Sequence, residues 1–99
     1  MNIQNQYNPD HVSPPGETLK EILEERGLTV KELAGRIALF EQSIIEQSLL
    51  RIIENKAPID SEMALRLKLV LGIETSFWSN RERHYREAIL RREEGDRHD

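Results

Sequence analysis

Apolar residues recur along this chain at the spacing typical of helices. Leu19, Ile22 and Leu23 form the first such group, and their spacing places all three side chains on one helical face. The same pattern continues through most of the chain, so we predict an all-α fold. The predicted helices cover residues 16–26, 30–40, 44–55, 61–71 and 76–92.

Residue types at the ends of these segments support the boundaries. Pro15 suits the first turn of a helix, and Gly27 suits a helix end. Thr29 and Glu32 have the spacing of a capping box, in which each side chain accepts a hydrogen bond from the backbone of the other residue. We expect an extended arm at residues 1–15, one domain at 16–93 and a disordered, charged tail at 94–99.

A near-repeat interrupts the regular pattern in the middle of the chain. Residues 40–44 and 45–49 each carry Glu, Gln and Ser between two apolar residues. The apolar stripe therefore changes face where the two copies meet. The region also holds more apolar surface than a small helical core can cover, which predicts a homodimer; the residues concerned are Ile44, Ile45, Leu49 and Leu50.

Two backbone paths are compatible with this repeat. The chain can break near Gln42–Ser43, with Ser43 as the cap of a new helix. Alternatively the second and third helices merge, because no Gly, Pro, Asn or Asp lies between Arg36 and Glu54 to end a helix. We predict the merged or much extended helix, together with a domain-swapped dimer, since removal of a hinge turn promotes exchange between chains.

Several stretches in order, within about residues 11–90, resemble a known family. They are Pro15-Gly16-Glu17-Thr18-Leu19, Leu28-Thr29-Val30-Lys31-Glu32-Leu33-Ala34, Ile52-Ile53-Glu54-Asn55-Lys56-Ala57-Pro58-Ile59, Met63-Ala64-Leu65-Arg66-Leu67, Leu71-Gly72 and Ser76-Phe77-Trp78. This pattern is similar to the XRE, or lambda-repressor-like, family of helix-turn-helix proteins, and within it to the HigA-type antitoxins. The resemblance implies a five-helix, lambda-repressor-like fold with a C-terminal dimerisation helix.

The resemblance also implies partners. Members of this family bind a palindromic operator as dimers, and many bind a RelE-like toxin. Between Leu33 and Pro58, however, this chain is about five residues longer than the family pattern and lacks the turn glycine. Tyr85-Arg86-Glu87 is similar to members that continue into an ImmA/IrrE-like zinc peptidase domain, so the chain is either a stand-alone protein or part of a longer one.

The candidate DNA-binding residues follow the expected turn. Gln47, Ser48 and Arg51 would occupy the first two turns of a reading helix. A Gln amide can pair bidentately with adenine and an Arg guanidinium with guanine, while Arg36 and Lys56 can contact phosphates. The alternative interpretation is that these are ordinary solvated helix positions.

Charge sets a condition on any nucleic-acid partner. The 99-residue chain has a formal net charge of −4, so it has no general attraction to DNA. Binding would need a local basic patch, doubled by dimerisation. Residues 29–56 contain equal numbers of basic and acidic side chains.

Other functional classes find little support. The absence of cysteine excludes disulfides and thiolate metal sites and fits a cytoplasmic location. No apolar run approaches the ~20 residues of a membrane helix. The histidines at 11, 84 and 98 are scattered, and no nucleophile–base pair or phosphate-binding glycine loop is visible. We therefore expect no metal, no cofactor and no enzymatic activity.

These observations favour a DNA-binding transcriptional regulator of antitoxin type. It would bind a palindromic operator as a homodimer and block access to the promoter. The alternative is a helical, dimeric interaction module whose DNA reading has been lost through the insertion.

Overall fold

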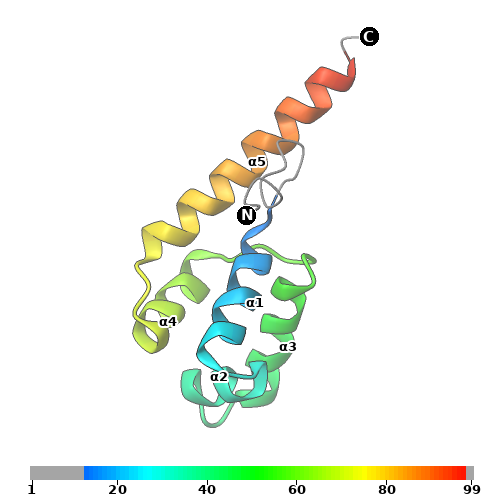
Figure 1. The fold of residues 1–99 in the computed structure, drawn as a ribbon. Helices are drawn as coiled ribbons and strands as arrows, with labels where there is room; N and C mark the ends of the chain where they lie inside the picture. Colours follow the sequence, from blue (N-terminus) through cyan, green and yellow to red (C-terminus); the bar gives the residue numbers. More distant parts are fainter. Residues whose placement is uncertain (1–12, 98–99) are drawn as a thin grey trace, which may run out of the picture.

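Five helices account for the regular structure of the described residues (Figure 1). The computed structural model describes residues 13–97, with side chains described as far as Glu94. The helices are α1 (Pro15–Arg26), α2 (Val30–Ile37), α3 (Gln42–Ile53), α4 (Ser61–Leu71) and α5 (Thr75–Arg97). The all-α prediction is confirmed for this part of the chain, whereas residues 1–12 of the arm predicted at 1–15 lie outside it.

The predicted merged helix is wrong, because α2 and α3 are separate. The α2 helix ends at Ile37, and Ala38 is extended, with φ −153° and ψ 123°. Residues from both helices enter the same core, among them Leu33 of α2 and Leu49 of α3, each with no exposed surface. A single straight rod cannot place both of these faces in one core, so packing favours a reversal of the chain between the two helices.

One chain completes its own core. The fully buried large side chains come from every helix: Leu19, Leu33, Leu49, Leu67 and Trp78. Burial of such a side chain stabilises a fold by about 1.5–3 kcal/mol. Since no half-core is left to be filled by a second chain, the physical reason for predicting a domain-swapped dimer disappears.

Local capping sets several helix ends. The predicted capping box starts α2: the backbone N–H of Thr29 donates to Glu32 at 2.9 Å, and that of Glu32 donates to the Thr29 hydroxyl at 3.0 Å. The hydrogen bond from the Thr29 backbone is the main reason why the pKa of Glu32 is lowered. Asp60 caps α4 by accepting from the Met63 backbone at 2.8 Å. Gly27, in the left-handed conformation (φ 70°), ends α1.

The start of α1 lies against the end of α3. A Cβ atom added at Gly16 would stand 1.9 Å from the carbonyl oxygen of Ile52, so only glycine fits at this approach. At the other end of α1, the Arg26 guanidinium donates to the carbonyl oxygen of Leu71 at 2.8 Å and so ties α1 to the C-terminus of α4. These two contacts fix α1 between α3 and α4.

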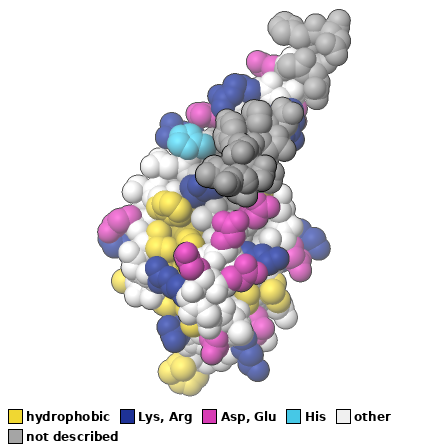
Figure 2. Space-filling view, in the orientation of Figure 1, with side chains coloured by type: hydrophobic (Ala, Val, Ile, Leu, Met, Phe, Trp, Pro, Cys, Tyr) yellow, Lys and Arg dark blue, Asp and Glu magenta, His cyan; other side chains and the backbone are white. Residues whose placement is uncertain are grey.

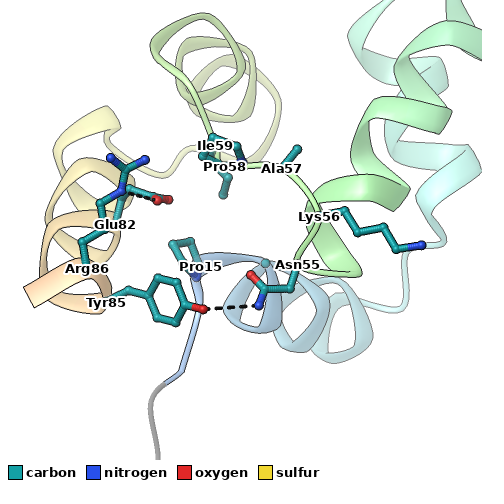
Figure 3. Close-up of a pocket in the computed structure, with 10 residues that line it drawn as sticks. Pro15, Asn55, Lys56, Ala57, Pro58, Ile59, Glu82, Tyr85 and Arg86 are labelled. Carbon is teal, nitrogen blue, oxygen red and sulfur yellow. Dashed lines mark hydrogen bonds and ion pairs between the residues drawn. The ribbon is translucent and has the colours of Figure 1, made fainter. Parts of the chain in front are cut away.

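The first half of α5 packs on the globule, while its second half extends beyond it (Figure 1). Trp78 anchors the packed half in the core with no exposed surface. Tyr85 lies about two turns further along α5. Its hydroxyl accepts a hydrogen bond from the amide of Asn55 at 3.3 Å, across a hollow of about 310 Å³ (Figure 3). The helix continues to Arg97, past its predicted end at residue 92.

Candidate nucleic-acid interface

The α2–α3 connection consists of residues 38–41 and needs no glycine. The Ala38 N–H donates to the Ala34 carbonyl at 3.0 Å, which closes α2, and the Ile45 N–H donates to the Glu41 carbonyl at 3.0 Å, which begins the bonding of α3. The Gln42 amide also donates to the Lys31 carbonyl of α2 at 3.2 Å. Backbone and side-chain hydrogen bonds together therefore hold α2 and α3 on either side of a four-residue connection.

The chain breaks between α2 and α3, but Ser43, the cap considered for the alternative path, does not cap α3. The α3 helix begins one residue earlier, at Gln42, and its N-cap residue Glu41 makes no side-chain capping bond. The N–H groups of the first turn lack the side-chain acceptor that Thr29 supplies to α2.

Helical periodicity divides α3 into two faces. Its buried side is formed by Ile45, Leu49 and Ile52, each at most 4% exposed. At ~100° per residue, Ile44, Gln47 and Arg51 fall within about 60° of one another on the opposite side, and all three are exposed. These three residues are called the outward stripe below.

The five predicted DNA-binding residues fall into different settings. Gln47 and Arg51 belong to the outward stripe, and Arg36 is exposed in the last turn of α2. Ser48 is half-buried and lines a hollow of about 240 Å³ between α3 and α4. Lys56 follows α3 in the connection to α4 and borders the hollow at α5 shown in Figure 3. The structure thus places two of the five side by side on one exposed helical face.

Local contacts engage the two basic side chains at one end of this surface. The Lys56 ammonium lies 3.4 Å from the Glu54 carboxylate, and the Arg51 guanidinium donates to the Lys56 carbonyl at 3.3 Å. Acidic and basic side chains also alternate over the face seen in Figure 2. Both contacts are exposed, and a surface ion pair such as that of Lys56 and Glu54 is worth about 0–1 kcal/mol.

Three apolar residues of the α2–α3 connection and the first turn of α3 are exposed, and of these only Ile44 was predicted from the sequence as surplus apolar surface. Phe40 is 99% exposed, Leu39 80% and Ile44 66%. Leu39 and Phe40 belong to the α2–α3 connection, and Ile44 belongs to the first turn of α3. This end of the fold lies at the bottom of Figure 1, and Figure 2 shows apolar side chains there. The near-repeat is the signal that points to them, because Ile44 and Ile45 cannot both face the core of one helix.

The predicted surplus of apolar residues is only partly real. Ile45 and Leu49 are buried within their own chain, whereas Ile44 and Leu50 stay exposed. The argument for a homodimer from this region therefore rests on fewer side chains than the sequence indicated.

The described residues hold no group of three or more His, Asp and Glu side chains placed to bind a metal ion. None of the helices in residues 13–97 is long and apolar enough to cross a membrane. His84 is exposed on α5.

Comparison with known proteins adds no family assignment. No protein-family model matches the chain, and no curated protein matches it. The structure defines the class of protein as a small, all-helical, five-helix domain.

Proposed function

We propose that this chain is a DNA-binding transcriptional regulator of antitoxin type that acts as a homodimer. The observation that carries the proposal is the outward stripe of α3, in which Gln47 and Arg51 stand exposed after a short turn. The sequence resemblance to the XRE family and its HigA-type antitoxins supports the same function.

In this proposal α3 enters the major groove, which is wide enough to admit a helix. The Gln47 amide accepts a hydrogen bond from adenine N6 and donates one to N7, and the Arg51 guanidinium donates to guanine O6 and N7. Arg36 and Lys56 contact phosphates and set the position of the domain. Ser48, which is half-buried, is the remaining candidate for a contact with the DNA.

Two copies of the domain would read the two halves of a palindrome. The half-sites are expected one turn of DNA apart, about 34–36 Å, or a multiple of that spacing. The bound dimer blocks access to the promoter, and a RelE-like toxin is the protein partner that an antitoxin of this kind binds. A monomer in sedimentation equilibrium at tens of micromolar would contradict the dimer.

Selection from a pool of random duplexes at low salt tests the DNA-binding proposal. We expect an enriched palindrome. On that site, Gln47→Ala and Arg51→Ala should each cost ~1–3 kcal/mol of binding free energy and relax the preference at one base pair. Lys56→Ala should weaken binding to all sequences alike and make the salt dependence less steep.

Arg91→Ala is the matched control for these variants. It removes the same charge as Arg51→Ala from an exposed position on the distal part of α5. Its affinity should stay close to that of the unmodified chain. If no palindrome is enriched, the DNA-binding proposal is abandoned.

A second function is favoured by a specific observation, the exposed apolar tip formed by Leu39, Phe40 and Ile44. In this alternative the chain is an interaction module that no longer reads DNA, and the tip contacts a protein. It predicts no enriched duplex, together with a change of oligomeric state or partner binding on Phe40→Ala.

A further inference from the structure

The α3 helix ends in a turn that holds Arg51 by two hydrogen bonds. The Lys56 N–H donates to the Arg51 carbonyl at 2.8 Å, and the Arg51 guanidinium donates back to the Lys56 carbonyl at 3.3 Å. A guanidinium carries five N–H groups, so one bond to a carbonyl leaves enough donors for a bidentate contact with guanine. The direction of the Arg51 side chain therefore depends on where this turn places the Lys56 carbonyl.

Asn55 sets the path of the turn. Among the described residues, it is the only one other than glycine with a positive φ, 63°. Its N–H donates to the Ile52 carbonyl at 3.0 Å, which together with the bond from Lys56 to Arg51 is the pattern of a Schellman motif. Glycine usually occupies the left-handed position of this motif, because the conformation is strained for a residue with a Cβ atom. A contact that holds Asn55 therefore also holds the turn.

Tyr85 supplies such a contact from a different helix. The Asn55 amide donates to the Tyr85 hydroxyl at 3.3 Å, and the two side chains point toward each other across the hollow in Figure 3. Trp78, two turns earlier on α5, has no exposed surface and ties this part of the helix to the core. The Tyr85 hydroxyl is thus a fixed acceptor against which the side chain of Asn55 rests.

We infer that Tyr85 is a positioning residue for the base contact of Arg51. Through Asn55 it holds the turn whose Lys56 carbonyl orients the guanidinium. This role rests on the proposed DNA-binding function and adds to it a residue of α5 that acts without contacting a base. Immobilising a flexible side chain at an interface costs free energy, and a side chain that is already oriented in the free protein lowers that cost. The preference for guanine therefore depends on a hydroxyl 30 residues beyond Asn55.

The test uses the palindrome recovered by the selection described above. The base pair read by Arg51 is the one whose preference is lost in Arg51→Ala. Its guanine–cytosine pair is replaced by adenine–thymine in one half-site, and the ratio of the two affinities measures discrimination. Tyr85→Phe should lower this ratio about two- to twelve-fold, the worth of one hydrogen bond. The preference at the base pair identified by Gln47→Ala should stay unchanged, because Gln47 lies one turn before Arg51 and makes no contact with the terminal turn.

Two further variants show whether the effect passes through the turn. Asn55→Gly removes the amide but keeps the backbone path, since glycine adopts the left-handed conformation readily. In this background Tyr85→Phe should not lower the ratio further, because the bond that it breaks is already absent. Thr29→Ala is the matched control for lost stability, because it removes the cap of α2. It should keep the full preference at the base pair read by Arg51.

A second measurement on Tyr85→Phe needs no DNA. Nitrogen-15 NMR reports the exchange rate of the Lys56 amide and the position of the Arg51 Nε–H signal. In Tyr85→Phe the Lys56 amide should exchange faster with solvent, and the Arg51 signal should shift, because the turn is held less firmly. If both signals match those of the unmodified chain, the positioning role of Tyr85 is overturned, whatever the chain binds.

The results on DNA separate the positioning role from the function on which it rests. An enriched palindrome on which Tyr85→Phe keeps the full discrimination overturns the role of Tyr85 and leaves DNA binding intact. An equal loss at the base pairs of Arg51 and Gln47 also overturns it, since Tyr85 would then serve only the stability of the fold. If no palindrome is enriched, the DNA-binding proposal falls, and the role of Tyr85 falls with it.

Discussion

Replacing Gly16 by alanine should destabilise the fold more than an ordinary helix substitution. Alanine is the better helix former by about 1 kcal/mol, and Gly16 lies in the first turn of α1. The new Cβ, however, would stand 1.9 Å from the Ile52 carbonyl oxygen, 2.8 Å from its carbonyl carbon and 3.3 Å from the Cα of Ile53. All three atoms are backbone, so no rotamer change relieves the overlap.

The expected magnitude follows from these opposing effects. Overpacking of a tight contact costs typically 1–3 kcal/mol, and more where the backbone has to move, here by about 1 Å. Helix propensity offsets about 1 kcal/mol of this cost at most. We therefore expect a net loss of roughly 2 kcal/mol or more, which lowers the melting temperature by about 10 °C in a domain of this size.

Gly35→Ala is the matched control for Gly16→Ala. Gly35 lies inside α2, and a Cβ atom there meets only the flexible side chain of Gln42, at 3.4 Å. This variant should be neutral or stabilised by up to about 1 kcal/mol. Urea titration followed by far-UV circular dichroism measures both changes.

Two results would refute this reasoning about Gly16. One is a Gly16→Ala variant within about 0.5 kcal/mol of the unmodified chain, the range of ordinary surface substitutions. The other is an equal loss in both glycine variants, which would mean that alanine itself disfavours these helices. Trimming Ile52 to alanine should not rescue Gly16→Ala, because the obstacle is the carbonyl group and not the side chain.

Three further predictions concern helix caps and one long-range contact. Thr29→Ala should cost ~1 kcal/mol in urea titration because Thr29 is a true N-cap, whereas Ser43→Ala, inside the first turn of α3, should be neutral or mildly stabilising; an equal loss would contradict the observed start of α3. Tyr85→Phe should cost about 0.5–1.5 kcal/mol through loss of the bond to Asn55, and no change would mean that water replaces it. The lowered pKa of Glu32 stabilises the fold above the ordinary value of 4.5, and this contribution is lost as the pH falls through the lowered pKa. The stability difference between the unmodified chain and Glu32→Gln should therefore shrink in acid, and a constant difference from neutral pH to strong acid would contradict it.

Helix ends with a local chemical cause could be predicted from the sequence. The capping box of Thr29 and the left-handed glycines at 27 and 72 act within a few residues. The start of α2 is therefore as predicted, and α1 and α4 differ from their predicted ranges by at most one residue. The break between α2 and α3 could not be predicted in this way. Ala38 takes an extended conformation without any turn-forming residue, since the packing of Leu33 and Leu49 in one core decides the path.

The same distinction applies to the candidate site. The placement of Gln47 and Arg51 on one face follows from the helical period alone and was predictable. The exposure of Phe40 and Ile44 depends on which copy of the near-repeat packs into the core. Ile45, which begins the second copy, is the residue that is buried. The role of Gly16 was likewise hidden, because its constraint comes from a carbonyl group 36 residues further along the chain.

The overhang of α5 implies a gradient of amide hydrogen exchange along that helix. Near Trp78 the backbone is covered by the core, so its amides should exchange only when the whole domain unfolds. The side chains of residues 91–94 are exposed, and a helical segment of this length has little stability of its own in water. Amides there should exchange through local fraying and lose protection turn by turn toward Arg97. Slow exchange in those last turns would indicate that a second molecule binds to this part of α5.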